Sequence, residues 1–236
     1  FQKLPSRAWL EKINPEALNQ GLVKRIIWQH LSLSSAARTA LCDVLFVPGG
    51  SYSGDFEPIV TMSRNLLPFE WRELRRYGIR PVCLKLLVLR YTQSRSYRSA
   101  DGVIFLTEYA KNAVLKVTGS FSGQKAIIPH GISPRFQLKP KEQKPIGEYS
   151  DINPFRLLYV SIIDQYKHQW HLIEAVHTLR AQGFPVRLDF IGPAYPPALT
   201  RLRVAISGFD PDEMWVRYHG AVPHEVLHNL YAQADL

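Results

Sequence analysis

Short apolar runs, each followed by a stretch with helical periodicity, recur along the whole chain and restrict its fold more than any other feature of the sequence. The apolar runs are 43–47, 58–62, 102–107 and 125–129 in the first part of the chain, and 156–161, 186–192 and 215–220 in the second. Near-continuous apolar strands that alternate with helices, here over 171–181 and 199–206, are typical of parallel sheets covered on both sides. The sequence therefore predicts an α/β protein whose strands are buried on both faces.

A polar, proline-bearing stretch interrupts this alternation between Lys139 and Asn153. Such a stretch is typical of a connection between domains. We therefore expect a first Rossmann-like domain over 1–138, a linker over 139–152 and a second Rossmann-like domain over 153–236. Two such domains that face each other place the carboxyl ends of their strands across one cleft, which is where open α/β sheets bind ligands. Functional residues are expected at strand ends.

Both domains are expected to be incomplete. The chain begins at Phe1 rather than Met, and its first strand is expected to be missing. Residues 231–236 have the pattern of a helix that turns into a strand, with no capping glycine and no polar tail.

The composition excludes several classes of protein. A hydrophobic content of 46% is sufficient for real cores and excludes a wholly disordered chain. The two cysteines, Cys42 and Cys83, cannot build the disulfide framework of a small secreted domain, so a reducing compartment such as the cytoplasm is expected. The longest apolar run, 82–91, is interrupted by Lys85 and Arg90 and is much shorter than the roughly 20 residues of a membrane-spanning helix.

Positive charge is concentrated in residues 71–99, which contain eight basic residues and the single acidic residue Glu73, for a net charge of +7. Three basic residues at the start of this segment, Arg72, Arg75 and Arg76, have the spacing of one helical face. The same helical spacing relates four apolar residues further on, which are Leu84, Leu87, Val88 and Tyr91. One interpretation is a solvated helical face. The other is an anionic partner, and lipid headgroups or a phosphorylated acceptor fit a basic amphipathic helix better than nucleic acid, which would favour regularly spaced aromatic side chains.

Residues 224–228 match the pattern His-Glu-x-x-His, in which His224 and His228 could bind zinc while Glu225 acts as a general base. However, Pro223 places His224 in the first turn of the expected helix, and no His or Glu follows as a third ligand. We therefore interpret the two histidines as half-exposed helix residues and expect no bound metal.

Two further stretches have side chains or glycines suited to anions. Lys167 stands between a predicted strand and a predicted helix, where a lysine and backbone N–H groups together can bind a phosphate. His168 and His171 open the same helix and are either phosphate contacts or surface residues. Gly49 and Gly50 belong to a glycine-rich loop without a helix directly after it, so we interpret this loop as a flexible acceptor-side loop or a plain turn.

Several of these segments together resemble the group 1 type of retaining glycosyltransferases, which have the GT-B fold. Residues 159–175, a strand, a loop with Lys167 and a helix, resemble the opening of the family's donor domain. The segments that resemble the following part of the donor domain are 188–192 and 218–236, and those that resemble the last strands of the acceptor domain are 105–111 and 127–132.

The resemblance implies that a sugar is transferred with retention from a nucleotide sugar to a glycan or a lipid-linked glycan. In this fold fixed cations and helix N-termini usually neutralise the leaving diphosphate without a metal, so no cofactor is expected. The implied donor-side residues are Lys167, Ser161, His168, Gly192 and Gly220, and the acceptor-side residues are Gly49, Gly50, Thr107 and His130. The expected location is the cytoplasm, at the inner face of the cell membrane, with residues 71–99 in peripheral contact and with no nucleic acid partner.

The sequence departs from the family pattern in three respects. Ser161 and Ile162 stand where the family commonly has Gly-Arg, so another group must replace one cation. The family often has a histidine after the second strand, whereas here Arg64 and Asn65 are the catalytic candidates. The family's paired glutamates would follow the last residue of this sequence, and its glycine-rich loop would precede the first.

Three alternatives from other classes remain open at this stage. A sugar-nucleotide binding module without turnover, or an inactive remnant, would carry the same motifs. A zinc peptidase would require metal at His224 and His228. A nicotinamide-dependent oxidoreductase would require Gly-x-Gly-x-x-Gly after a first strand, and the sequence does not contain that motif.

Overall fold

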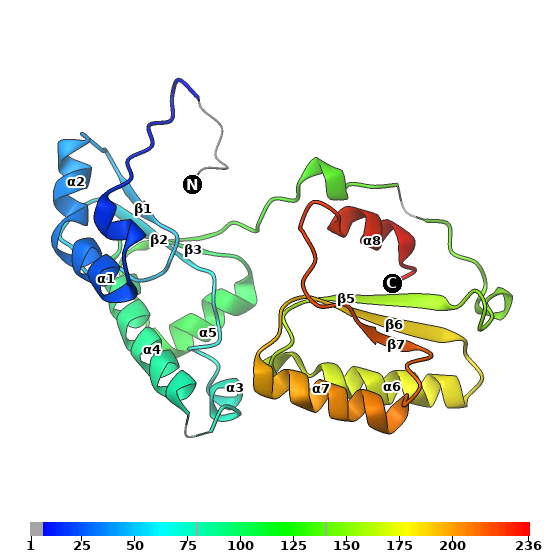
Figure 1. The fold of residues 1–236 in the computed structure, drawn as a ribbon. Coiled ribbons are helices and arrows are strands. Elements are labelled where there is room, and N and C mark those ends of the chain that lie inside the picture. The colour runs from blue at the N-terminus through cyan, green and yellow to red at the C-terminus, as the bar shows by residue number, and fades with distance from the viewer. Residues whose placement is uncertain (1–6, 79, 140) are drawn as a thin grey trace. The chain divides into compact units, whose positions relative to one another are not determined.

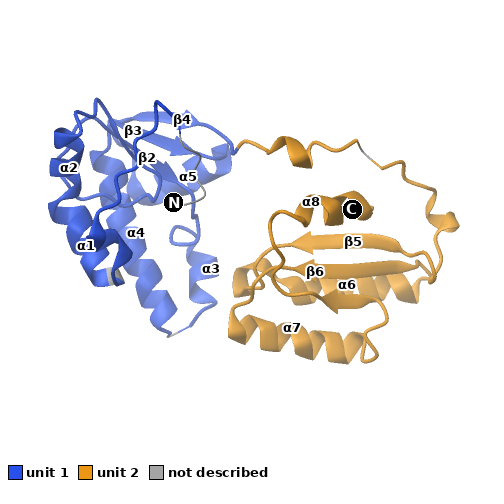
Figure 2. Cartoon of the chain, turned by 45° about the horizontal axis from the view of Figure 1, so that its top comes forward, with its two compact units in different colours: residues 1–130 blue, residues 131–236 orange. Residues whose placement is uncertain are grey.

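A computed structural model describes residues 7–78, 80–139 and 141–236 of the chain. The chain divides into two compact units, Phe1–His130 and Gly131–Leu236 (Figure 2). Each unit has its own parallel sheet, so the predicted α/β class with two Rossmann-like parts is confirmed. Among the helices of the described chain, none is both long enough and apolar enough to cross a membrane.

Unit 1 contains a four-stranded parallel sheet in the order β1-β2-β3-β4. Its elements are η1 (Glu16–Asn19), α1 (Leu22–Leu31), α2 (Leu33–Thr39), β1 (Leu45–Val47), β2 (Ile59–Ser63), α3 (Trp71–Arg75), α4 (Pro81–Ser99), β3 (Gly102–Phe105), α5 (Glu108–Thr118) and β4 (Gln124–Ile127). The register pairs Val60 with Gly102 and Ile104 with Ala126. Neighbouring strands are joined through helices or long connections, as parallel pairing requires.

The core of unit 1 lies around the two central strands, because the edge strands have only one neighbour each. Residues of β2 and β3 that form this core include Ile59, Val103 and Phe105, all at most 2% exposed. The expectation that every strand is buried on both faces is wrong for both edge strands of unit 1, since all four residues of β4 are exposed and Phe46 of β1 is 48% exposed. As the strand at the edge of the sheet, β4 packs against β3 alone.

Unit 2 contains a three-stranded parallel sheet in the order β5-β6-β7. Its elements are η2 (Pro134–Phe136), η3 (Ile146–Glu148), β5 (Phe155–Val160), η4 (Gln165–Lys167), α6 (Gln169–Ala181), β6 (Val186–Ile191), α7 (Pro196–Phe209), β7 (Val216–Tyr218) and α8 (Leu227–Gln233). Figure 1 shows α6 and α7 on one face of this sheet and α8 on the other. Leu188, Phe190 and Val216 point into the core against α6 and α7, and each is 0% exposed.

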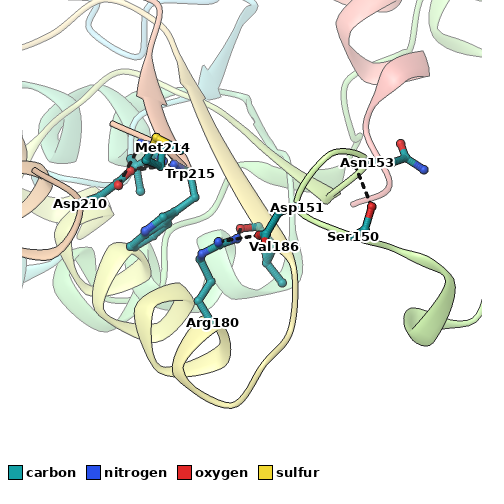
Figure 3. A network of polar contacts seen from close by, with 9 residues as sticks. Ser150, Asp151, Asn153, Arg180, Val186, Asp210, Met214 and Trp215 are labelled. Atoms are coloured by element: carbon teal, nitrogen blue, oxygen red, sulfur yellow. Dashed lines mark hydrogen bonds and ion pairs between the residues drawn. The ribbon is translucent and has the colours of Figure 1, made fainter. Parts of the chain in front are cut away.

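Hydrogen bonds connect the amino ends of β6 and β7 to the ends of the helices that precede them, α6 and α7 (Figure 3). Asp210 is 3% exposed, and its carboxylate accepts hydrogen bonds from the backbone N–H groups of Trp215 and Val216 at 2.8 and 2.7 Å. Arg180 at the end of α6 donates to the backbone oxygen of Val186 at 2.9 Å and to Asp151 at 2.8 Å. These contacts fix where β6 and β7 begin.

The stretch 139–152, expected to be a linker, lies within unit 2 rather than between the units. Asp235 explains this placement, because its side chain is 1% exposed and accepts hydrogen bonds from Lys141 at 2.6 Å and Tyr149 at 3.0 Å. Its second oxygen accepts from the backbone N–H of Arg156 in β5 at 2.9 Å. Burial disfavours the ionised carboxylate, but these hydrogen bonds outweigh it and hold the pKa of Asp235 below its usual value.

Candidate functional site

The carboxyl ends of β5, β6 and β7 bring three of the expected donor-side residues together. Ser161 follows β5 directly, Gly192 follows β6 directly, and Gly220 comes two residues after β7. The N–H of Ser161 donates to the oxygen of Ile191 at 2.9 Å, and the N–H of Gly192 donates to the oxygen of Gly220 at 2.8 Å. Strand ends of this kind are the usual ligand position in open α/β sheets.

The two glycines at this edge differ in what surrounds them. Gly192 has φ of +143°, and a Cβ atom there would overlap the backbone oxygen of Ser161. Gly192 therefore permits two strand-end loops to approach each other, a structural requirement that exists without any ligand. Gly220 has φ of +73°, and a Cβ atom there would meet no atom within 4 Å. The backbone at Gly220 is thus open to a close approach by a ligand.

The loop after β5 is held by bonds at both of its ends. Asp164 accepts a hydrogen bond from the N–H of Gln165 at 2.6 Å and so begins η4. Ile163 pairs with the loop after β6, donating to the oxygen of Pro193 and accepting from the N–H of Tyr195, each at 2.9 Å. Gln169, only 1% exposed, donates through its side-chain amide to the oxygen of Ile162 at 2.8 Å. The loop therefore has a defined shape before any ligand binds.

Lys167 ends this loop, two residues before the first residue of α6. Its backbone oxygen accepts a hydrogen bond from the hydroxyl of Tyr159 at 3.4 Å, and its ammonium lies 5.1 Å from the ring centroid of Tyr166. The start of a 13-residue helix carries partial positive charge, so an anion placed here would meet both the helix end and the lysine.

The two histidines near Lys167 differ in backbone conformation and exposure. His168 adopts the left-handed conformation, with φ of 55° and ψ of 31°, and its ring centroid lies 5.9 Å from that of Trp170. His171 is exposed, and its Nδ1 lies 3.7 Å from a carboxylate oxygen of Glu174. The ring of His171 also lies 6.0 Å from that of Trp170 and 5.8 Å from that of His168, so the two histidines and Trp170 form one aromatic group at the start of α6.

Sequence reasoning missed a further cation, Arg201 of α7. Its guanidinium lies 4.0 Å from the ring centroid of Trp170, in the first turn of α6. Ile162, which stands where the resembling family commonly has an arginine, is 36% exposed and uncharged. A lone arginine on a predicted helix gives no sequence signal for this contact, because the contact depends on how α6 and α7 pack.

The expected residues of unit 1 all follow the carboxyl ends of its strands, and parallel pairing places those ends at one edge. Gly49 and Gly50 follow β1, Arg64 and Asn65 follow β2, Thr107 follows β3, and His130 follows β4. Arg64, Gly49 and His130 are exposed. Two of the others have local structural roles, since Thr107 caps α5 by accepting from the N–H of Ala110 at 3.1 Å, and Asn65 accepts from the N–H of Leu67 at 3.1 Å.

Gly50 packs against a buried polar cluster of α4 that the sequence did not reveal. Gly50 has φ of +75°, and a Cβ atom there would lie 2.8 Å from the hydroxyl of Tyr97 and 3.2 Å from the side-chain nitrogen of Gln93. Tyr97 and Gln93 are 0% and 5% exposed. Burial raises the pKa of the Tyr97 hydroxyl, which therefore stays protonated. The glycine-rich loop is thus seated on α4.

The pair His224 and His228 does not have the geometry of a zinc site. His224 lies in the turn before α8, which begins at Leu227, rather than in the first turn of a helix. Its Nδ1 is in contact with the guanidinium of Arg135, and the ring of Phe136 packs against both histidines. Within residues 7–78, 80–139 and 141–236, no group of three or more His, Cys, Asp or Glu side chains is placed to hold a metal ion.

Comparisons with known proteins show what this chain is similar to. No protein-family model matches it, and no curated protein matches it in sequence. Among solved structures, sucrose-phosphate synthase from Thermosynechococcus elongatus is 17% identical with a TM-score of 0.63, and the match covers 96% of this chain and 56% of the other. A glycosyltransferase from Rickettsia africae is 13% identical with a TM-score of 0.57, covering 95% and 57%.

The Anabaena protein HepE in complex with UDP is also similar, with 15% identity, a TM-score of 0.51, and coverage of 84% of this chain and 47% of the other. The chain thus spans about half the length of each of these structures. At such low identity the likeness shows the fold, and the expected GT-B type of fold with Rossmann-like units is confirmed.

Proposed function

We propose that this chain belongs to a glycosyltransferase that takes a sugar from a nucleotide-sugar donor held at the strand ends of unit 2. The observation that carries the proposal is the convergence of Ser161, Gly192 and Gly220 at one edge, beside Lys167 and the start of α6. The fold it shares with sucrose-phosphate synthase, and with HepE solved in complexes with UDP and with UDP-glucose, supports the same reading.

The charge of a departing nucleoside diphosphate defines the role of each group at this edge. Lys167 and the N–H groups that begin α6 stabilise the diphosphate as negative charge develops on it. The loop between β5 and α6 is fixed before binding, so these donors need little reorganisation. Arg201 is the group that supplies the second cation, in place of the uncharged Ile162. In this proposal the leaving group is neutralised by these fixed cations and by the start of α6.

The acceptor is proposed to lie at the strand-end edge of unit 1, where Gly49, Gly50, Thr107 and His130 gather and where Arg64 and Asn65 are the catalytic candidates. A glycan or a lipid-linked glycan is the proposed acceptor, with retention of the anomeric configuration. The proposed location is the cytoplasmic face of the membrane, with residues 71–99 as the contact segment.

Nucleotide binding to the chain 1–236 tests the donor-site part of the proposal. Isothermal titration with UDP, GDP and ADP should reveal binding of at least one nucleoside diphosphate, and the nucleotide sugar with that base should compete for the same site. If none of the three binds, unit 2 is not a donor site. Incubation of the full-length protein with the bound nucleotide sugar then separates an enzyme, which releases the diphosphate, from a binding module, which does not.

A further inference from the structure

Helix α4 of unit 1 exposes several apolar side chains along one face. Leu84, Leu87, Val88 and Tyr91, here called the α4 stripe, lie on one helical face and are 66%, 38%, 54% and 68% exposed. On a helix that covers a sheet, an apolar stripe normally faces the core. A contiguous apolar face at the surface marks an interaction site more often than isolated exposed leucines do.

The opposite face of α4 is already packed and is mostly polar, although Leu86 is also buried there, at 5% exposure. Gln93, Ser94 and Ser96 are at most 7% exposed, and Tyr97 stacks on Phe69 with 5.9 Å between ring centroids. The hydroxyl of Ser96 accepts a hydrogen bond from the backbone N–H of Tyr52 at 3.1 Å. Because this face holds the loop that contains Gly50, α4 cannot turn Leu84, Leu87, Val88 and Tyr91 inward without breaking those bonds.

The charge around the α4 stripe selects among possible partners. Lys85 is exposed beside the stripe, and Arg95 is exposed one helical turn beyond Tyr91. Trp71 of α3 is 50% exposed, and the guanidinium of Arg90 lies 5.9 Å from its ring centroid. Apolar side chains bordered by basic ones are the pattern of helices that lie in the interface of an anionic membrane. Nucleic acid would use the charge but not the leucines.

We infer that the α4 stripe docks in the headgroup region of an anionic lipid bilayer, with Lys85 and Arg95 at the lipid phosphates. The helix that makes this contact holds the loop of Gly50 on its other face, so docking would fix that loop one helix diameter, roughly 10 Å, from the lipid surface. This inference rests on α4 alone and does not require that unit 2 binds a nucleotide. Under the proposed function it would bring the acceptor-side loop to lipid-linked acceptors.

Co-sedimentation of the chain 1–236 with vesicles tests the inference. The protein should pellet with vesicles of phosphatidylcholine and phosphatidylglycerol and stay in the supernatant with phosphatidylcholine alone. Lys85→Glu/Arg95→Glu should weaken partitioning at least about tenfold, because each basic residue near an anionic leaflet strengthens binding about fivefold. Leu84→Ser/Val88→Ser should also weaken it about tenfold or more, whereas Val204→Ser, which alters an equally exposed apolar residue on α7, should bind like the wild type.

A second measurement reports insertion rather than charge attraction. A polarity-sensitive fluorophore attached at Val88→Cys, in a background with Cys42→Ser and Cys83→Ser, should shift to shorter wavelength with anionic vesicles. Circular dichroism and nucleotide affinity of each variant, measured on the same samples, separate this result from misfolding and from the donor site. The inference is overturned if the wild type stays in the supernatant, if Leu84→Ser/Val88→Ser binds normally, or if the stripe instead mediates a dimer of this chain without lipid binding.

Discussion

Gly192 and Ser161 lie so close together that a Cβ atom on the glycine would overlap the backbone oxygen of the serine. The contact joins the loops that follow β5 and β6, the two strands whose ends carry most of the candidate donor site. A side chain at Gly192 must therefore push one strand end away from the other. The geometry of the edge and the stability of unit 2 depend on the same glycine.

We predict that Gly192→Ala lowers the free energy of unfolding by more than the strain of a positive φ angle alone would. Gly183→Ala is the matched control, because Gly183 also has positive φ, +89°, but has open space where its Cβ would lie. Urea unfolding should give a loss of about 1 kcal/mol for Gly183→Ala and a larger loss for Gly192→Ala. Equal losses would mean that the loops separate without cost.

We predict that Lys167→Ala weakens nucleoside diphosphate binding by about 1.5–3 kcal/mol, the usual contribution of a hydrogen bond to a charged group. Isothermal titration measures this loss directly. Lys144→Ala removes an exposed lysine from the segment that precedes β5 and should leave affinity unchanged. Unchanged affinity in Lys167→Ala would remove this lysine from the site.

Regular periodicity made the fold predictable, whereas contacts between distant segments were not. All seven apolar runs became strands, because continuous apolar stretches bounded by turns specify strands locally, whereas their burial depends on their place in the sheet. The same periodicity predicted the α4 stripe but not the direction in which it faces. That direction depends on Gln93 and Tyr97, which pack on Gly50, more than 40 positions away in the sequence. The role of Asp235, which binds Lys141 and Tyr149, also depends on tertiary contacts.

The donor-side residues illustrate the same limit at the site itself. Ser161, Gly192 and Gly220 were implied by the family resemblance, and each is the last residue of a predicted strand, so parallel pairing places them together. Arg201 has no such position in the sequence, and only the packing of α7 on α6 brings its guanidinium to Trp170. The start of α8 was displaced from expectation because Pro223 is followed by a turn before the helix begins.

We predict that zinc is not a component of this protein. Purified chain should contain no stoichiometric zinc, and a chelator should leave its unfolding temperature unchanged, because a structural metal would contribute strongly to stability. The contact of Arg135 with His224 gives the physical reason, since a guanidinium beside a ring nitrogen opposes a second cation there. One tightly bound zinc per chain would contradict this prediction.

The hydrogen bonds of Asp235 predict how acid affects unit 2. Because they hold the folded-state pKa below the unfolded value of about 3.9, the ionised carboxylate stabilises the fold above that pH. This contribution is lost as the pH falls through the folded-state pKa. At pH 7, Asp235→Asn should lower the free energy of unfolding by about 1–3 kcal/mol, because it weakens the bonds from Lys141 and Tyr149.

Urea unfolding between about pH 7 and pH 2 measures this difference, since the wild type and Asp235→Asn should converge toward the acid end as the carboxylate of Asp235 becomes protonated. Asp151→Asn is the matched control, because Asp151 pairs with Arg180 but its side chain is 80% exposed, and a solvent-screened ion pair contributes at most about 1 kcal/mol. If the difference in free energy of unfolding between wild type and Asp235→Asn stays constant across this pH range, then packing, rather than the charge of Asp235, holds residues 141–152 against β5.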